Sequence, residues 1–373
     1  MPFLRLRLAG HLRRVPQRYR ARMNENTRRS IIGITIAVVL GALVALAGSD
    51  GSVTTGGIAV FAVGAAIAYV INWIVFIPSS RAKTEKYYDL TGSITYLSVI
   101  GAALVLSSDF DVRAGIATAM VAVWALRLGT FLFRRVRRDG KDGRFDEIKM
   151  DPLRFFMAWT LQGLWVLLTV ACALAIVTAA ERKDIEWVAI VGIVVWIIGF
   201  AIEVIADRQK SAFRRDPSND GRFITTGLWA WSRHPNYFGE IALWTGMAIM
   251  AVPILSGWRW VLLISPIFVT VLLTRISGIP MLEARAEKRW GEDPEFRPTG
   301  GQASQYVGKA IHVGEWRNTL SYDEEAHFRT LEYLHAKGAE GQRTAYVAGR
   351  EFEDLDTIRG RASRPTPTTS SGS

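Results

Sequence analysis

The sequence has little cysteine and few charged residues for its length. Cys172 is the only cysteine among 373 residues, which excludes both a disulfide-stapled secreted domain and a cysteine-rich structural zinc site. Charged residues make up only 21% of the chain, whereas 50% of it is hydrophobic. This balance excludes a disordered chain. The hydrophobic residues are also gathered into long runs that are nearly devoid of charge, as in proteins that cross a bilayer core of roughly 30 Å.

Eight such runs predict an all-α, polytopic membrane helix bundle. We place the spans at about 31–48, 57–78, 90–108, 114–133, 155–180, 185–206, 237–255 and 258–276. A short amphipathic helix is predicted directly after them, over 280–291, because a glycine ends its helical pattern. We therefore expect a basic arm at 1–30, the bundle at 31–297 and a soluble, partly disordered extension at 298–373, with one helix near 322–338.

The positive charges predict the orientation of the bundle. Nine arginines and one glutamate among the first thirty residues supply +8 of the net charge of +11. With this arm inside, the three inside loops hold 17 Lys and Arg residues and the outside loops hold four. This bias predicts a multi-pass protein of the cell membrane with both termini cytoplasmic. An organellar transit peptide would also be rich in arginine. No nucleic-acid motif accompanies the basic arm, so we expect no nucleic-acid partner.

Four polar residues lie deep within the predicted spans, where such groups are costly and mark candidate functional sites. Arg127 and Glu203 both lie near the cytoplasmic side. They either form an ion pair that locks two helices or line a ligand cavity. Asn72 and Gln162 are typical of hydrogen bonds between helices.

The densest run of polar and aromatic residues lies between positions 203 and 240. Its basic residues suit the phosphates of a nucleotide cofactor, because guanidinium groups bind phosphate oxygens in pairs. Asp207 and Asn236 could form hydrogen bonds with a ribose or an amide of the cofactor, and Glu240 could reach the reacting end of the cofactor. The basic residues are Arg208, Lys210, Arg214, Arg215, Arg222 and Arg233, and flat surfaces for a base are offered by Trp229, Trp231 and Tyr237. The alternative is an ordinary positive-inside loop with interfacial aromatics.

The run Asp-Arg-Gln-Lys at 207–210, Gly-Leu-Trp at 227–229 and Ser-Arg-His-Pro-Asn-Tyr-Phe-Gly-Glu at 232–240 closely resembles the steroid 5-alpha-reductase C-terminal superfamily. Within it the likeness is to the bacterial branch known as DUF1295, to which Gly-Lys-Asp-Gly-Arg-Phe at 140–145 is also similar. The resemblance covers roughly 60–297. It implies a multi-helix membrane enzyme that uses NADPH to reduce a carbon–carbon double bond of a membrane lipid, typically one conjugated to a ketone.

The resemblance also implies cofactor-binding residues. An aspartate followed seven residues later by an arginine corresponds to Asp207 and Arg214. An arginine fourteen residues before the asparagine of the last motif corresponds to Arg222. The asparagine and glutamate that hold the nicotinamide correspond to Asn236 and Glu240. Arg208, Arg233 and His234 are further candidates for the phosphates, although His234 could instead cap a helix.

The early helices depart from the reductase pattern. The Gln-Glu pair that binds the enone oxygen in steroid reductases is absent, and Tyr88 with Asp89 occupies a comparable region. We predict this pair as the proton donor, with Tyr237 and His234 as competitors.

Two other functions stay open at this point. Isoprenylcysteine and phospholipid methyltransferases carry a similar Arg-His-Pro-x-Tyr-x-Gly element and use S-adenosylmethionine. The three spacings above favour the reductase. A membrane scaffold whose tail recruits a partner is the third reading.

Overall fold

The computed structural model describes residues 17–107, 111–139, 145–291 and 296. All of these belong to one compact unit. The C-terminal helix and tail expected beyond 297, the first half of the basic arm and residues 140–144 lie outside the described residues.

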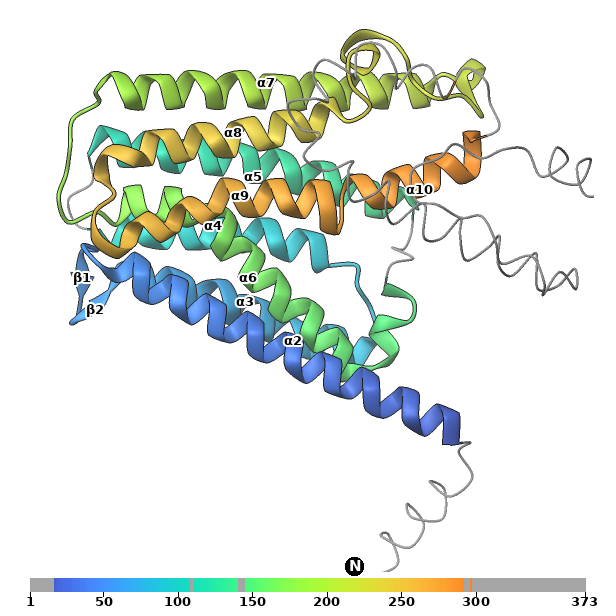
Figure 1. The fold of residues 1–373 in the computed structure, drawn as a ribbon, viewed down its shortest axis with the longest axis horizontal. Coiled ribbons are helices and arrows are strands. Elements are labelled where there is room, and N and C mark those ends of the chain that lie inside the picture. The colour runs from blue at the N-terminus through green and yellow to red at the C-terminus, as the bar shows by residue number, and fades with distance from the viewer. Residues whose placement is uncertain (1–16, 108–110, 140–144, 292–295, 297–373) are drawn as a thin grey trace, which may run out of the picture. The chain divides into compact units, whose positions relative to one another are not determined.

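Helices make up nearly all of the described chain, which confirms the all-α prediction (Figure 1). The long helices are α2 (Gln17–Ser49), α3 (Val60–Ala82), α4 (Tyr88–Leu106), α5 (Val112–Asp139), α6 (Pro152–Val177), α7 (Trp187–Arg215), α8 (Pro235–Ala251), α9 (Ile264–Val271) and α10 (Ile279–Trp290). Short 3-10 segments are η2 (Ile148–Met150), η3 (Pro217–Asn219), η4 (Gly227–Ala230), η5 (Val252–Ile254) and η6 (Gly257–Leu263), η7 (Leu272–Ile276) is a π-helical turn, and β1 (Thr54–Thr55) pairs antiparallel with β2 (Ile58–Ala59).

Eight helical segments in the described part of the chain are long and apolar enough to cross a membrane, and they coincide with the eight predicted spans. The protein is therefore a multi-pass membrane protein. The last segment is composite, because η6, α9 and η7 follow one another before the amphipathic α10 begins. A helix over 279–290 confirms the prediction made for 280–291.

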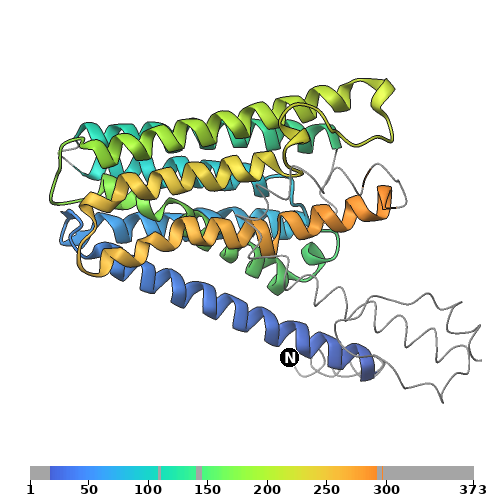
Figure 2. The ribbon, with the colours of Figure 1, turned by 45° about the horizontal axis from the view of Figure 1, so that its top comes forward.

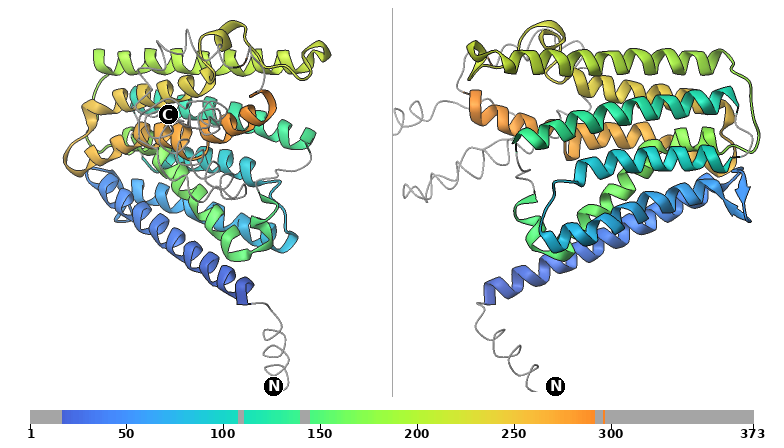
Figure 3. Two further views of the ribbon diagram at one scale, coloured as in Figure 1. Left: turned by 45° about the vertical axis from the view of Figure 1, so that its right-hand side comes forward. Right: turned by 180° about the vertical axis from the view of Figure 1, so that it is seen from behind.

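Helix α6 is the centre of the bundle. Every residue from Val166 to Val177 is buried, and α6 packs against α2, α3, α4, α5, α8 and α9 (Figures 1 and 3). Its polar side chains bond to neighbouring helices, because an unpaired polar group in an apolar interior is costly. Gln162 Nε2 donates to the carbonyl of Tyr88 at 2.9 Å. On α3, Asn72 Nδ2 donates to Thr95 Oγ1 at 3.4 Å, so the predicted interhelical roles of Asn72 and Gln162 are confirmed.

Helices α7 and α8 pack closely side by side (Figure 2). Two glycines on each helix, seven residues apart, face each other in antiparallel order: Gly192 meets Gly246, and Gly199 meets Gly239. A Cβ atom on any of these four glycines would lie only 2.5–2.6 Å from backbone atoms of the other helix. Small residues allow such close approach in membranes, where apolar side chains alone give no preference for protein over lipid. This contact fixes the register of the two helices that carry most of the candidate site.

The end of the bundle that carries the β1–β2 hairpin is closed by backbone contacts from buried arginines. Arg259, 2% exposed, donates to the carbonyls of Gly51 and Ala175 and so joins η6 to the turn after α2 and to the last turns of α6. Arg113, 1% exposed, donates to the carbonyl of Asp184. The hairpin and α10 lie at opposite ends of the bundle (Figure 1), and we refer to the second as the α10 end.

Candidate functional site

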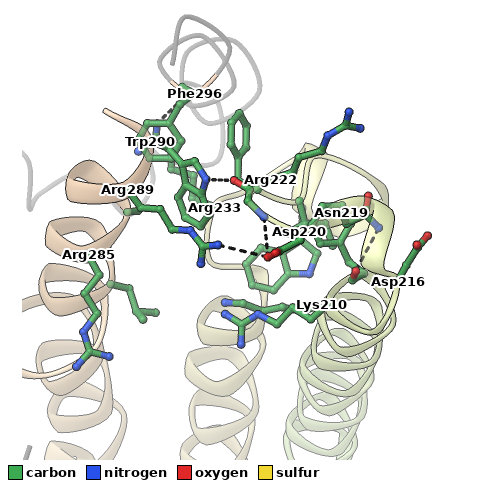
Figure 4. A pocket seen from close by; sticks show the side chains of 18 of the residues that line it. Lys210, Asp216, Asn219, Asp220, Arg222, Arg233, Arg285, Arg289, Trp290 and Phe296 are labelled. Carbon is green, nitrogen blue, oxygen red and sulfur yellow. Dashed lines mark hydrogen bonds and ion pairs between the residues drawn. The ribbon is translucent and has the colours of Figure 1, made fainter. Parts of the chain in front are cut away.

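A cavity of about 930 Å³ opens at the α10 end. Its walls are the last turns of α7, the loop between α7 and α8, and α10 (Figure 4). Basic side chains dominate its lining: Lys210, Arg214, Arg215, Arg222, Arg233, Arg285 and Arg289. Three acidic residues, Asp216, Asp220 and Glu283, also line it. The cavity therefore attracts anions, because low-dielectric walls concentrate the field of the cations that line them.

Helix α7 continues to Arg215, nine residues beyond the predicted end of its span. The loop predicted over 207–236 was therefore wrong for its first part. Arg214 and Arg215 in the last turn favour the longer helix by their interaction with its dipole, and Pro217 ends it. The extension matters because Glu203, Asp207, Lys210 and Arg214 are spaced as residues of one helix face. One face of α7 thus runs from the bundle interior into the cavity.

Arg127 of α5 is the centre of a partly buried ion-pair network. Its two terminal nitrogens contact Glu203 Oε1 and Asp207 Oδ2. The predicted Arg127–Glu203 pair is confirmed, and Asp207 is a second partner that the sequence did not indicate. Asn236 at the start of α8 donates to Asp207 Oδ1 at 3.3 Å. Two residues that were expected to bind the same cofactor, Asp207 and Asn236, therefore lie together.

Helix α8 begins at a proline. Pro235 occupies the first helical position, where its missing N–H costs nothing. His234 precedes the helix without a side-chain capping bond. Its ring stacks on Tyr237 with 5.8 Å between ring centroids. His234 also lines the cavity, so this ring pair leads from the cavity toward Glu240 one turn further along α8.

Glu283 of α10 holds two of the predicted phosphate-binding residues. Its carboxylate accepts from Arg233 Nη1 at 2.7 Å and lies 2.7 Å from His234 Nε2. Arg233 also donates to the carbonyl of Phe296 at 2.9 Å. Arg285, Arg289 and Trp290 join Glu283 in the cavity wall. None of these α10 residues was among the predicted site residues.

The loop between α7 and α8 is tied to both of its neighbours. Trp229 lines the cavity, its indole N–H donates to the carbonyl of Ala206 at 3.0 Å, and Lys210 Nζ lies 4.4 Å from its ring centroid. Trp290 of α10 donates to the carbonyl of Gly221 at 2.5 Å, and Arg289 reaches Asp220 (Figure 4). Of the three aromatic residues predicted to offer a flat surface for a base, Trp231 is 69% exposed and does not line the cavity.

The inner end of the site carries an aromatic cluster that the sequence did not indicate. Tyr96 of α4 packs edge-on against Trp124 of α5, and Trp124 packs edge-on against Trp244 of α8, with centroids 5.0 and 4.9 Å apart. Glu240 lies within electrostatic reach of Tyr96 and of Arg127. The cluster joins three helices that are distant in sequence, so no local spacing could have revealed it.

The other predicted residues occupy two different places. Arg208 points away from the ion-pair face of α7 and is exposed. The hydroxyl of Tyr88 donates to the carbonyl of Ala158 at 2.9 Å, and its ring packs against Phe145 and Trp159. Asp89 lies in the same first turn of α4. The contacts of Tyr88 are thus with α6 and the loop before it, not with the cavity, and the assignment of Tyr88 and Asp89 as proton donor stays a prediction.

Several buried polar atoms around α8 have no hydrogen-bond partner among the described residues: Glu203 Oε2, His234 Nδ1, Asn236 Oδ1 and the indole nitrogens of Trp124 and Trp244. Buried polar groups in proteins are nearly always paired. The atoms of His234 and Asn236 lie beside the cavity, so they are candidate contacts for a polar ligand.

A second ion pair lies beside the site rather than in it. Lys149, in the loop before α6, contacts Glu85 at 2.9 Å and Asp146 at 3.2 Å. The hydrogen bond to buried Glu85 raises the pKa of Lys149 above its usual value. This pair joins the α3–α4 and α5–α6 loops at the α10 end.

These features define a multi-pass membrane protein with a basic cavity at one end and a polar, partly unpaired interior behind it. A family model described as a protein of unknown function, DUF1295, matches residues 75–300. The chain belongs to this family, as the motifs predicted. No curated protein and no solved structure matches the chain.

Proposed function

We propose that this protein is an integral membrane reductase that uses NADPH to saturate a carbon–carbon double bond of a lipid. The observation that carries the proposal is the cavity at the α10 end. Arg214 and Arg222, whose spacings match those of the steroid reductases, both line it, and Asp207 and Asn236 lie together behind it.

The residues present fit this cofactor. A volume of about 930 Å³ lies near the top of the range of roughly 300–1,000 Å³ for small-molecule sites and suits a dinucleotide. The guanidinium groups of the wall match its phosphates. The buried and unpaired oxygen of Asn236 accepts a hydrogen bond from an amide, such as the carboxamide of a nicotinamide.

When bound, NADPH supplies the hydride that adds to one carbon of the double bond. Arg214 and Arg222 hold the phosphates, and Asn236 with Glu240 orients the nicotinamide toward the bundle interior. The chain must also donate a proton to the other carbon or to a conjugated oxygen. We assign this proton to the hydroxyl of Tyr96, because it lies beside Glu240. The predicted donors Tyr88, Asp89 and Tyr237 are the alternatives.

The lipid reaches Tyr96 from the bilayer, between helices. The excess of Lys and Arg in the predicted inside loops supports a topology with the α10 end and both termini on the cytoplasmic side of the cell membrane. In that topology the cofactor enters from the cytosol.

Cofactor binding to the detergent-solubilised protein tests the class of enzyme. A ligand that binds only the folded state raises the melting temperature, so NADPH, NADH and S-adenosylmethionine are compared. We expect stabilisation by NADPH. Loss of one charge-assisted phosphate contact, about 1.5–3 kcal/mol, weakens its binding roughly 10- to 100-fold in Arg214→Ala and in Arg222→Ala. Exposed Arg208, on the same helix but outside the cavity wall, gives the matched control Arg208→Ala.

Unchanged NADPH affinity in both cavity variants would contradict the phosphate assignment. Stabilisation by S-adenosylmethionine instead of NADPH would replace the reductase by a membrane methyltransferase.

The proton donor is tested by conservative variants. Tyr96→Phe removes only a hydroxyl, so we expect it to slow NADPH oxidation by about 10²–10⁴-fold on enone-bearing sterols or quinones, as for a lost general acid. NADPH affinity should not change. A large loss in Tyr88→Phe with little effect of Tyr96→Phe would return the role to Tyr88.

A further inference from the structure

The interior behind the cavity contains more acidic than basic side chains. Glu203 and Asp207 of α7 share the single guanidinium of Arg127. Glu240 of α8 lies in the field of all three but has no ion-pair partner of its own among the described residues. Lys210 is the next cation on this face of α7 and interacts with Asp207. Two cations therefore face three carboxyl groups.

Helix packing forces Glu203 and Glu240 together. A Cβ atom on Gly239 would lie 2.6 Å from the backbone nitrogen of Glu203 and 3.0 Å from its Cβ, so the backbone of α8 rests against Glu203. Glu240 is the next residue of α8. Glu203 is 4% exposed, and its Oε2 has no hydrogen-bond partner in the described chain. The backbone positions of Glu203 and Glu240 are therefore held close to each other, and the two carboxyl groups interact electrostatically.

One excess negative charge in this interior must be neutralised. An uncompensated buried charge costs several kcal/mol, and charged groups within membrane spans are paired for that reason. We do not assign the neutralising charge to a metal ion, because the described residues contain no group of three or more His, Cys, Asp or Glu side chains placed to hold one. A proton held between two neighbouring carboxylates is the established alternative, because two like charges in one site are not both ionised.

We propose that Glu203 and Glu240 hold one proton between them and store the proton that the reduction consumes. The charged and titratable groups facing the pair are Arg127 from α5, Tyr96 from α4, and Asp207 and Lys210 from α7. Helix α6 contributes the neutral Thr169 beside Tyr96, and α9 has no ionisable residue. The site thus joins a proton store on one side to the cavity on the other.

This role rests on the proposed function, and its chemistry balances. Reduction of one double bond consumes one hydride and one proton. The O–H bond of Tyr96 breaks as the proton passes to the substrate, and the phenolate takes the stored proton from the Glu203–Glu240 pair. The pair is then a dianion, and it regains one proton from water that reaches Asp207 and Lys210 through the cavity. Glu203 can carry the proton on Oε2, because Arg127 contacts only its Oε1 atom.

Infrared spectroscopy of the cofactor-free protein tests the store directly. A protonated carboxylic acid has a carbonyl stretch that a carboxylate lacks and that shifts in deuterium oxide. We expect this band at neutral pH in the wild type, and we expect its loss in Glu203→Gln or in Glu240→Gln. Glu85 is the matched control, because it is also buried, at 6% exposure, but forms an ion pair with Lys149. The substitution Glu85→Gln should leave the band unchanged.

A variant that changes the charge balance gives a second readout. Arg127→Met removes one cation, so a second proton must be taken up and the band area should roughly double. Absence of the band at neutral pH, or its persistence in both Glu203→Gln and Glu240→Gln, would overturn the proposal. Loss of the band on addition of Na⁺ or K⁺ would also overturn it, by making a cation the neutralising group.

The spectra separate this inference from the proposed function, since no cofactor is present. A band that behaves as expected in a protein that does not bind NADPH would refute the reductase and leave the shared proton standing. If NADPH binds and the band is absent, the shared proton is refuted and the proposed reductase stands.

Discussion

The contact between α7 and α8 offers the sharpest prediction about the fold. The substitution Gly239→Ala adds a single methyl group where a Cβ atom would lie 2.6 Å from Gly199 O and from Glu203 N. Ordinary van der Waals contact begins at 3.4 Å, so the helices must separate locally by about 0.8 Å. The Asp207–Asn236 hydrogen bond is already 3.3 Å long and breaks when α8 moves away from α7.

The energy follows from two opposing effects. Overpacking a close contact costs about 1–3 kcal/mol, whereas alanine favours a helix over glycine by about 1 kcal/mol. Gly101 of α4 isolates the second effect, because a Cβ atom there has no neighbour within 4 Å. We expect Gly101→Ala to be neutral or stabilising. Because the helix-propensity gain is common to both variants, Gly239→Ala should be less stable than Gly101→Ala by the overpacking cost alone, about 1–3 kcal/mol.

Thermal unfolding of both variants in the same detergent measures the difference, and NADPH binding is measured in parallel. Gly239→Ala should lose stability and cofactor affinity together, because the same helix contact positions Asn236. Equal stability of Gly239→Ala and Gly101→Ala would show that α7 and α8 are not in direct backbone contact. The relative positions of α7 and α8, and with them the proximity of Asp207 and Asn236, would then be wrong.

Two further predictions concern residues at the edge of the site. Glu283→Gln removes a negative charge from the cavity while keeping the shape of the side chain. NADPH should therefore bind more tightly, by up to about tenfold for a gain of about 1.4 kcal/mol. Weaker binding in a titration would mean that Glu283 positions Arg233 and His234 instead of competing with the cofactor phosphates for them. Lys149→Met removes the hydrogen bond to Glu85 and should lower the free energy of unfolding by about 1.5–3 kcal/mol at neutral pH. Because the pKa of Lys149 is raised in the folded state, its stabilisation is complete below the ordinary lysine pKa of about 10.4 and is lost as the pH rises through the folded-state value. Alkaline unfolding curves should therefore be flatter in the variant, and identical curves would contradict a stabilising pair.

Much of the fold follows from local sequence patterns. The eight spans were predictable because an apolar run long enough to cross a membrane is a property of contiguous residues. The Arg127–Glu203 pair was predictable for a different reason, since two opposite charges buried near the same membrane face need each other. The end of α7 was misjudged because charge density at 207–215 is typical both of a loop and of a helix that projects from the membrane.

Site residues that lie on one helix could be predicted from the sequence, whereas those from distant helices could not. Asp207 and Arg214 are seven residues apart on one helix, so their shared face follows from the helical repeat. Glu283 and Tyr96 escaped prediction because they come from helices far away in the sequence, and their proximity to α8 is set by tertiary packing alone. A sequence signal did exist for the helix contact itself, in the pairs of glycines seven residues apart on α7 and α8.

The position of the unpaired polar atoms connects the cofactor proposal with the proton proposal. Asn236 and Glu203 both contact the network of Arg127 and Asp207, and each retains one buried oxygen without a partner. An amide donor satisfies the oxygen of Asn236, and a proton satisfies the oxygen of Glu203. A hydride donor and a proton donor are the two reactants that reduction of a double bond requires in addition to the lipid. Their proposed positions lie on adjacent turns of two helices whose register is fixed by glycine, so one substitution at Gly239 disturbs both.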